Sequence, residues 1–385
     1  MKTGLNHAVR VTVAALSIVL GLGAAAPATA QCPGDLTGNG AIDGLDLAGV
    51  LSAWGTSGGE LDGDINNDGI VNGADLSVVL GGWGACPVAN VRAWGCGHMD
   101  TGNNNQYGQT IVPSDLGPCI SVAGGTYHSI ALRPDGFIRA WGLNSSGQCN
   151  VPGNLGRCIG IGAGYRHTVV IQTDGTVRAW GETADGSTAV PTDLGPCISV
   201  AGGGFHSIAL RTDSSVRAWG FNGFGQCNVP ADLGPCSAVS GGYYHTVVLR
   251  TDGAVRAWGA GAGGSSVEAN FGQSIVPVGL GPCVGISAGL YHTVALCSDG
   301  TVRAWGAGSS YGPFDPNYNQ SNVPTNLGPC LQVAAGAYHT VALRSDGSIR
   351  AWGLDGHGQV SGQPVDLQPC ISIAAGGFHN IALED

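Results

Sequence analysis

Two short segments near the start of the chain carry oxygen-bearing side chains at the spacing that a calcium loop requires. The second segment reads DINNDGIVNGAD over residues 64–75. Positions 1, 3, 5, 9 and 12 are polar, and position 6 is the glycine at which such a loop turns. Hard oxygen donors in this order wrap one Ca²⁺. The predicted ligands are Asp64, Asn66, Asp68, the Ile70 carbonyl, Asn72 and Asp75.

The first segment, DLTGNGAIDGLD over residues 35–46, repeats the pattern less completely. A threonine takes position 3, where an acid or an amide is usual, so we expect this calcium site to be the weaker one. For both segments, the alternative interpretation is a solvated acidic turn. The predicted ligands of the first site are Asp35, Thr37, Asn39, the Ala41 carbonyl, Asp43 and Asp46.

Each loop runs into an apolar stretch that suits a short helix ending at glycine, over 45–55 and 74–84. Tandem 12-residue loops with Asp at position 12, each followed by one helix, resemble dockerin modules. The resemblance implies calcium-dependent folding and a cohesin-like or cell-surface partner. In dockerins, residues at the helix start select the partner, and here the pairs Gly44-Leu45 and Gly73-Ala74 offer no hydroxyl pair. The resemblance therefore supports calcium-driven folding more strongly than cohesin binding.

The calcium-loop module is predicted to span residues 31–87, and a cysteine stands near each end of it. A Cys32–Cys86 disulfide would close a loop of about 55 residues, worth up to about 4 kcal/mol in the chain-entropy model. Two free thiols are the alternative. A module of this size gains most from such a crosslink.

Residues 1–30 are predicted to be a cleaved export signal. Lys2 and Arg10 precede or border an apolar run, and Ala28-Thr29-Ala30 forms a small-x-small cleavage site. An uncleaved anchor is the alternative. The protein is therefore expected to be secreted or held at the cell surface, where disulfides are permitted.

Removing those 30 residues leaves 13 basic and 26 acidic groups and no lysine, because Lys2 and Arg10 are two of the 15 basic residues. A nucleic-acid partner would require a basic face that displaces counterions from phosphates. The charge balance excludes that class of function. We also expect a monomer.

From residue 91 onward the chain repeats one unit seven times. VRAWG or a near copy recurs, and each unit also carries a cysteine and an aromatic-His-(Thr/Ser) phrase or a variant of it. In Tyr243–Gly259, two β-rich runs flank an Asp-Gly turn, which indicates a hairpin. The seven Trp are 94, 141, 180, 219, 258, 305 and 352, the seven His are 128, 167, 206, 245, 292, 339 and 379, and the seven Cys are 119, 158, 197, 236, 283, 330 and 370.

Units of about 40 residues with three or four strands each are typical of propeller blades. The repeats begin at VRAWG without the preceding strand and end at FHNIALED without the following one. Pairing of these two segments would close the ring and remove two sheet edges. The predicted fold is mainly β: a seven-bladed propeller over residues 88–385, closed by its terminal strands and preceded by a small α-helical calcium-loop module.

The phrases VRAWG-x-N-x-x-GQ-x-x-VP, at 216–230, and AAG-x-YHTVAL, at 334–343, resemble the repeats of the regulator of chromosome condensation family. They are closest in style to the secreted β-lactamase inhibitor propellers built on that repeat. The resemblance implies binding of other proteins through loops on one face of a disc. Nuclear members exchange nucleotide on a small GTPase, but the export signal, the acidic charge and the absence of lysine after residue 30 argue against that partner here.

The repeated residues are expected to be structural. Equivalent positions in a propeller are spread around a ring and rarely converge on one ion, so we expect the histidines to bond backbone between strands. The tryptophans are expected to pack between blades, and the LGPC-type cysteines to fill apolar sites. Cys149 and Cys227 each lie nine residues before their blade's cysteine, which suggests bridges within a blade, with free thiols as the alternative.

Three of the seven units are eight residues longer than the shortest in one loop. The distance from the repeated Trp to the next repeated Cys is 25 after Trp94, Trp258 and Trp305, and 17 or 18 elsewhere. Aromatic residues among Asn, Gly and Ser suit a recognition surface, and a tolerated surface insertion is the alternative. The predicted ligand-binding residues are Tyr107, Phe271, Tyr311, Phe314 and Tyr318.

Three functions remain open at this point. The favoured one is a non-catalytic protein that binds a protein or a carbohydrate and is attached through its calcium module. The alternatives are an extracellular glycoside hydrolase or lyase in polysaccharide catabolism, because dockerins commonly accompany such enzymes, and a structural surface protein. No metalloprotease motif or phosphate loop is present, and no catalytic residue is assigned.

Overall fold

The computed structural model describes residues 41–42, 44–54, 71, 76, 79, 84–85, 89–97, 105–261, 270–307 and 317–385. Seven sheets of three antiparallel strands account for the repeats, so the predicted seven-bladed propeller is confirmed, with three strands in each blade. The blades are β4–β6 (Ser121–Gly124, His128–Leu132, Ile138–Gly142), β7–β9 (Cys158–Ala163, His167–Gln172, Val177–Gly181), β10–β12 (Cys197–Gly202, His206–Arg211, Val216–Gly220), β13–β15 (Cys236–Gly241, His245–Arg250, Val255–Gly259), β16–β18 (Cys283–Ala288, His292–Cys297, Val302–Gly306), β19–β21 (Cys330–Ala335, His339–Arg344, Ile349–Gly353) and β22–β23–β3 (Cys370–Ala375, His379–Glu384, Asn90–Gly95).

Each blade is built the same way, as β13–β15 illustrates. The inner strand β13 pairs with the middle strand β14, and a β-bulge follows Cys236. The middle strand then turns through Thr251-Asp252-Gly253 into the outer strand β15, with Leu249 opposite Val255. Gly253 has φ +82°, a conformation that glycine adopts without a steric penalty, which is why Asp-Gly predicts this turn.

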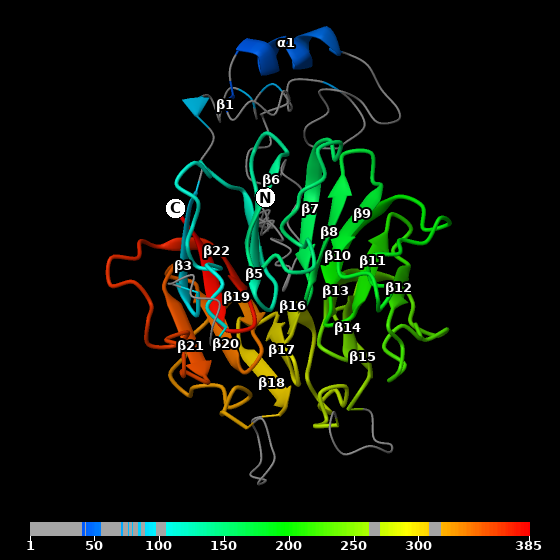
Figure 1. Cartoon of the computed structure of the whole chain (residues 1–385), viewed down its shortest axis with the longest axis vertical. Coiled ribbons are helices and arrows are strands. Elements are labelled where there is room, and N and C mark those ends of the chain that lie inside the picture. The colour runs from blue at the N-terminus through cyan, green and yellow to red at the C-terminus, as the bar shows by residue number, and fades with distance from the viewer. Residues whose placement is uncertain are drawn as a thin grey trace, which may run out of the picture.

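The two ends of the repeat region pair within one blade, as predicted. Outer strand β3 lies against β23, with His379 opposite Gly95 and Leu383 opposite Val91. In Figure 1 the cyan β3 lies beside the red strands of the last blade. Ile381 and Leu383 of that blade share a buried core with Val122 and Trp141 of the first blade, so the ring closes through packing as well as pairing.

The hydrophobic core lies between blades rather than within them. Each of the seven large clusters combines side chains from two successive blades. For example, Ile208 and Leu210 of one blade pack on Val239, Val248 and Trp258 of the next. No blade can bury its faces alone, so the closed ring is the unit that folds.

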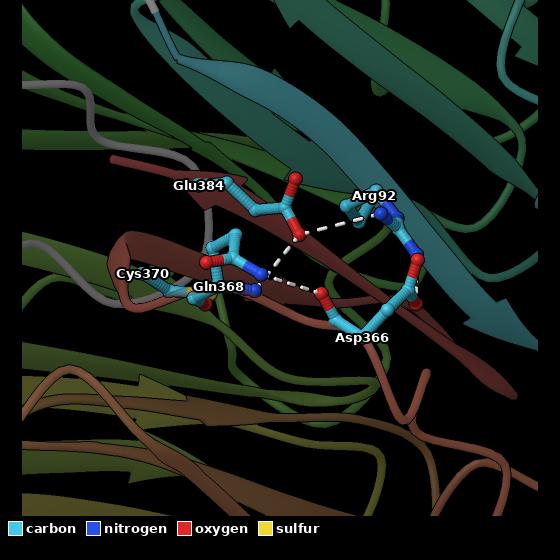
Figure 2. A network of polar contacts seen from close by, with 5 residues as sticks. All are labelled: Arg92, Asp366, Gln368, Cys370 and Glu384. Carbon is cyan, nitrogen blue, oxygen red and sulfur yellow. Dashed lines mark hydrogen bonds and ion pairs between the residues drawn. The ribbon is translucent and has the colours of Figure 1, made fainter.

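A polar network fastens the closing blade (Figure 2). Arg92 on β3 donates to Asp366 at 2.7 Å and pairs with Glu384 of the last strand at 3.4 Å. The same Glu384 carboxylate accepts the backbone N–H of Gln368 at 3.1 Å. The Glu384 side chain is only 7% exposed, so Arg92 and the Gln368 N–H take the place of water around its carboxylate.

We expect Arg92→Ala to destabilise the propeller by about 1–2 kcal/mol, because it leaves a buried carboxylate without its cation. The matched control is Arg217→Ala, since Arg217 occupies an equivalent outer-strand position but pairs with Asp193, which is 71% exposed. That exposed pair is expected to contribute at most about 0.5 kcal/mol. Urea unfolding followed by tryptophan fluorescence measures both, and equal effects of the two substitutions would contradict a special role for Arg92.

In the N-terminal region, the described residues include one helix and one short ladder. Helix α1 spans Gly44–Ser52, which overlaps the first stretch predicted to be helical. Strand β1 (Ala41–Ile42) pairs with β2 (Gly84–Ala85). Val50, Val71 and Val79 form a small buried core. Among the described residues, no helix has the length and apolar character needed to cross a membrane.

Most of the N-terminal predictions lie outside the described residues. This holds for the export signal 1–30, for Cys32 and Cys86, and for every calcium ligand except Ala41 and Asp46, which belong to β1 and α1. The calcium sites and the Cys32–Cys86 disulfide therefore stay predictions.

Candidate ligand-binding face

The strand order gives the propeller two chemically different ends. At one end lie the turns from inner to middle strand and the loops that follow each outer strand; at the other lie the Asp-Gly turns. The first end carries the aromatic-His phrases and the enlarged loops. We call it the aromatic face.

Aromatic side chains next to the repeated histidines form a closed circle on this face. Tyr127 lies 5.7 Å from Tyr165 between ring centroids, and Tyr165 lies 5.4 Å from Phe205. The circle continues from Phe205 through Tyr243, Tyr291, Tyr338 and Phe378 back to Tyr127, with neighbouring centroids 5.0–6.2 Å apart. Tyr244 stands beside Tyr243, at 4.4 Å. These are the spacings of favourable aromatic pairs, and none of the eight side chains is fully buried.

A second set of rings from the outer-strand loops stands beside the circle. Three of them were predicted as ligand-binding residues: Tyr107, Phe271 and Tyr318 contact Tyr127, Tyr291 and Tyr338 at 5.4, 5.2 and 5.3 Å, respectively. Phe221, Phe224 and His357 occupy the same kind of loop in other blades. Tyr318 is 43% exposed and Phe221 39% exposed, so both present ring surface to solvent. The other two predicted residues, Tyr311 and Phe314, lie outside the described residues.

One sector of the aromatic face is polar. Arg166 stands where the six other blades have Tyr or Phe before the histidine, and its guanidinium carbon lies 5.2 Å from the centre of the Tyr165 ring. Glu182 accepts the Ser146 hydroxyl at 3.1 Å and the backbone N–H groups of Thr183 and Ala184. The bond from the Ala184 N–H is the main reason that the pKa of Glu182 is lowered. This carboxylate is therefore held in its loop.

Other charges gather away from the aromatic face. Arg133–Asp135 and Arg250–Asp252 pair at the Asp-Gly turns, at 2.8 and 3.1 Å. On the aromatic face, burial raises the pKa of Tyr127, Tyr243 and Tyr291, the last to about 12. These phenols stay neutral near pH 7, so they offer hydroxyl groups and ring faces but no base.

The circle surrounds a small hollow on the propeller axis, with a volume of about 40 Å³. Its wall is made almost entirely of glycine and alanine from the ends of the inner strands. Backbone groups of successive blades meet there, as in the bond from the Thr126 N–H to the Gly164 carbonyl at 3.2 Å. A hollow of this size holds only a few water molecules, so a larger ligand would rest on the rings above it.

Directly behind the aromatic circle, the seven repeated histidines form a closed chain of hydrogen bonds between blades. His206 Nε2 lies 3.0 Å from the Thr246 hydroxyl of the next blade, and that hydroxyl donates to the Gln226 carbonyl at 2.8 Å. The hydroxyl has one proton, so the histidine nitrogen must donate. The corresponding partners of the other histidines are Thr168, Ser207, Thr293, Thr340, Asn380 and Ser129.

The structural interpretation of the histidines holds, with a different partner from the one expected. Each bonds a side chain of the next blade rather than backbone. Each repeated Trp donates its Nε1–H to the same carbonyl that the hydroxyl uses, as Trp258 does to Gln226 at 3.0 Å. In the closing blade the Asn380 amide takes the place of the hydroxyl, and Trp94 donates to the Gln359 carbonyl that it uses. The predicted packing of the tryptophans between blades is confirmed.

The repeated cysteines are buried at the start of the inner strands, as predicted. The suggested bridges within a blade are wrong, because Cys149, Cys158, Cys227 and Cys236 are all free. Cys149 lies in a loop of the aromatic face, with its sulfur 3.3 Å from the Leu143 carbonyl, whereas Cys158 begins a strand at the opposite end. The chain between the two cysteines therefore runs from one end of the blade to the other, which keeps the two sulfur atoms apart.

Comparison with known proteins identifies the repeat. The sequence pattern described as "Regulator of chromosome condensation (RCC1) repeat" matches residues 119–148, 158–186, 197–226, 236–264, 283–312 and 331–359. A search among curated proteins finds no match to this sequence.

Several solved structures share the fold. Prp20p from Saccharomyces cerevisiae is 17% identical, with a TM-score of 0.60 over 77% of this chain and 91% of that one. Human WBSCR16 is 17% identical, with a TM-score of 0.57 over 69% of this chain and 86% of that one. The ectodomain of the receptor kinase CR4 from Physcomitrella patens is 18% identical, with a TM-score of 0.53 over 67% of this chain and 68% of that one.

Proposed function

Because this chain is a propeller built of regulator of chromosome condensation (RCC1) repeats, we propose that it is a non-catalytic binding protein whose aromatic face grips a protein or carbohydrate ligand. The observation that carries the proposal is the closed circle of half-buried rings, extended by rings from the outer-strand loops. Rigid aromatic surface with two side-chain torsions per residue gives contact area at low entropic cost.

The charge distribution supports this choice of face. Glu182, Asp185 and Asp355 lie in its loops, and all three accept backbone N–H bonds. These bonds fix the three carboxylates within their loops, which favours ligand binding over acid–base catalysis.

Prp20p, which shares the fold, has binding properties to Gsp1p and histones. Here we propose a ligand outside that class, because no lysine follows residue 30 and acidic groups outnumber basic ones.

Tyr318→Ala and Phe224→Ala are each expected to weaken ligand binding about tenfold or more, since truncating a central aromatic anchor costs about 2 kcal/mol. Phe137→Ala is the matched control, because Phe137 is 56% exposed in an Asp-Gly turn at the opposite end. The ligand is first found by screening the protein against polysaccharides and against extracellular proteins, and titration calorimetry then measures the affinities. Equal losses in all three variants would contradict the proposed face.

The same screen separates binding from the enzymatic alternative. Purified protein is incubated with each retained polysaccharide, and soluble reducing ends and unsaturated products are measured over time. Retention without release supports the binding function. Sustained release that survives Tyr318→Ala would overturn it in favour of a glycoside hydrolase or lyase.

We further propose that residues 31–87 attach the protein, in a calcium-dependent way, outside the cell. The support is the two loop patterns at 35–46 and 64–75, and the small core of Val50, Val71 and Val79 that the second loop shares with α1. Removing calcium with a chelator is expected to unfold this module while leaving the propeller folded. Far-ultraviolet circular dichroism of the full chain, compared with an Asp64→Ala, Asp68→Ala variant, measures the loss of helix. An unchanged spectrum on chelation would contradict calcium binding.

A further inference from the structure

One blade differs from the others in what faces its repeated cysteine. In six of the blades, the cysteine that begins the inner strand is paired across the sheet with a residue near the end of the middle strand. In three blades this partner is Arg211, Arg250 or Arg344, and in two others it is Gln172 or Glu384. In the blade β16–β18, Cys283 faces Cys297.

The local ladder brings these two cysteines close together. The Cys283 N–H donates to the Gly253 carbonyl at 2.8 Å, and the Cys297 N–H donates to the Thr301 carbonyl at 2.8 Å. Neither amide bonds the opposite cysteine, so the two form a narrow, non-hydrogen-bonded pair, for which the Cα atoms are about 4.5 Å apart. Disulfides span Cα separations of about 4.4–6.8 Å.

The side chains also lie on the same side of the sheet. Cys283 and Cys297 belong to one hydrophobic cluster, and their exposures are 4% and 6%. Their sulfur atoms contact neighbouring carbonyls, of Gly281 and Leu280, each at 3.7 Å. The strand pairing and the shared cluster therefore place the two cysteine side chains next to each other.

Both cysteines are free thiols in the structure. Unlike the cysteine pairs at opposite ends of a blade, they face each other, and we propose that under oxidising conditions Cys283 and Cys297 form a disulfide that joins the inner and middle strands of this blade. Thiol–disulfide exchange with a low-molecular-weight or protein disulfide supplies the oxidant. One cysteine thiolate attacks the oxidant's sulfur and releases one thiol; the second thiolate then attacks the mixed disulfide and releases the other. Two cysteine S–H bonds are lost, one S–S bond forms, and the oxidant's disulfide is reduced to two thiols.

The folded sheet protects the bond once it has formed. Burial, together with the neighbouring Cys297, raises the pKa of Cys283 to about 12, so little thiolate exists in the closed blade. Exchange therefore occurs while the hairpin is still open, and reduction later requires local opening. Cys330, at the equivalent place in the next blade, faces Arg344 and cannot form this bond.

Full-length protein, refolded in a mixture of reduced and oxidised glutathione, tests the proposal. Free thiols are alkylated in denaturant, and peptides are analysed by mass spectrometry before and after reduction. We expect a linked peptide pair containing Cys283 and Cys297, lighter by two hydrogens than the reduced pair, whereas Cys330 is alkylated without reduction. Alkylation of both Cys283 and Cys297 in non-reduced protein, or linkage of either to another cysteine, would overturn the proposal.

Thermal unfolding gives a second readout. Cys297→Arg restores the residue that three other blades carry, and Cys297→Ser is the smaller change if the arginine variant fails to fold. Reductant is expected to lower the unfolding temperature of the unmodified protein by several degrees and to leave either variant unchanged. An equal effect of reductant on the protein and on the folded variant would contradict the assignment.

Discussion

Acidification below about pH 6 is expected to unfold the propeller, because seven histidines are buried in their neutral form. Burial lowers the pKa of each from an ordinary value of 6.5. Every one donates through Nε2 to the next blade, and protonation would add a charge where no solvent reaches. The pKa falls to about 3 for His128, His206, His245, His292 and His379, and to about 4 for His167 and His339.

The direction of the effect follows from proton uptake. Between about pH 6.5 and pH 4 the unfolded chain binds protons at these histidines and the folded chain does not, so stability falls as the pH falls. Each histidine contributes about 1.4 kcal/mol per pH unit in this window, and the seven together contribute on the order of 10 kcal/mol per unit. That slope would exhaust the stability of a typical domain, about 5–15 kcal/mol, within two pH units.

Tryptophan fluorescence across a pH titration, with urea unfolding at several pH values, measures this slope. His206→Gln retains an N–H donor but no longer titrates, so its slope is expected to be lower by about one seventh. Refolding on return to neutral pH shows that the transition is an equilibrium. A dependence of stability on pH that corresponds to only one or two protons, or unfolding only below pH 3, would contradict the burial of seven neutral histidines.

Gly203→Ala is expected to destabilise the protein by about 3 kcal/mol or more. A methyl group at this position would clash with His206 Cε1 and would lie 2.8 Å from the Gly242 carbonyl oxygen. The histidine cannot move aside, because it is fully buried and bonded to Thr246. Overpacking of a rigid site costs about 1–3 kcal/mol, and a backbone contact to the next blade adds to it.

The control for this substitution is Gly153→Ala, in a surface loop where a methyl group would meet nothing within 4 Å. Its effect on stability is expected to be within about 0.5 kcal/mol. Thermal and urea unfolding of both variants provide the measurement. If Gly203→Ala were as stable as Gly153→Ala, the close approach of the glycine backbone to the histidine ring would be wrong.

The repeated spacing of Trp, His and Cys was enough to predict the blades, the Asp-Gly hairpins and the closure of the ring. Each marker recurs at the same place in every unit. The last unit has no outer strand of its own, and the segment at the start of the repeats supplies it, as the pairing of β3 with β23 shows. The position of Tyr107, Phe271 and Tyr318 in one kind of loop was also predicted from sequence, because an insertion of equal length in three units marks that loop. Their role in ligand binding stays a prediction.

The aromatic circle and the histidine partners could not be predicted in the same way. Tyr127 and Phe378 are about 250 residues apart and meet only because the ring closes. The side-chain partner of each histidine comes from the next blade, at the position that follows that blade's own histidine, and a single repeat does not reveal it. The recurrence of an aromatic residue before histidine was the available signal, but the repeat pattern cannot distinguish a core ring from one at the surface.

The direction of β3 has a mechanical consequence. Its first residue, Asn90, follows the N-terminal module in sequence and lies at the end of the propeller that carries the Asp-Gly turns. Its last residue, Gly95, lies at the aromatic face. If the module anchors the protein and a ligand pulls on that face, tension runs along the strand. The hydrogen bonds between β3 and β23 would then be loaded together in shear rather than one after another. The strand pair that closes the ring therefore also lies in the orientation that best resists a pulling force.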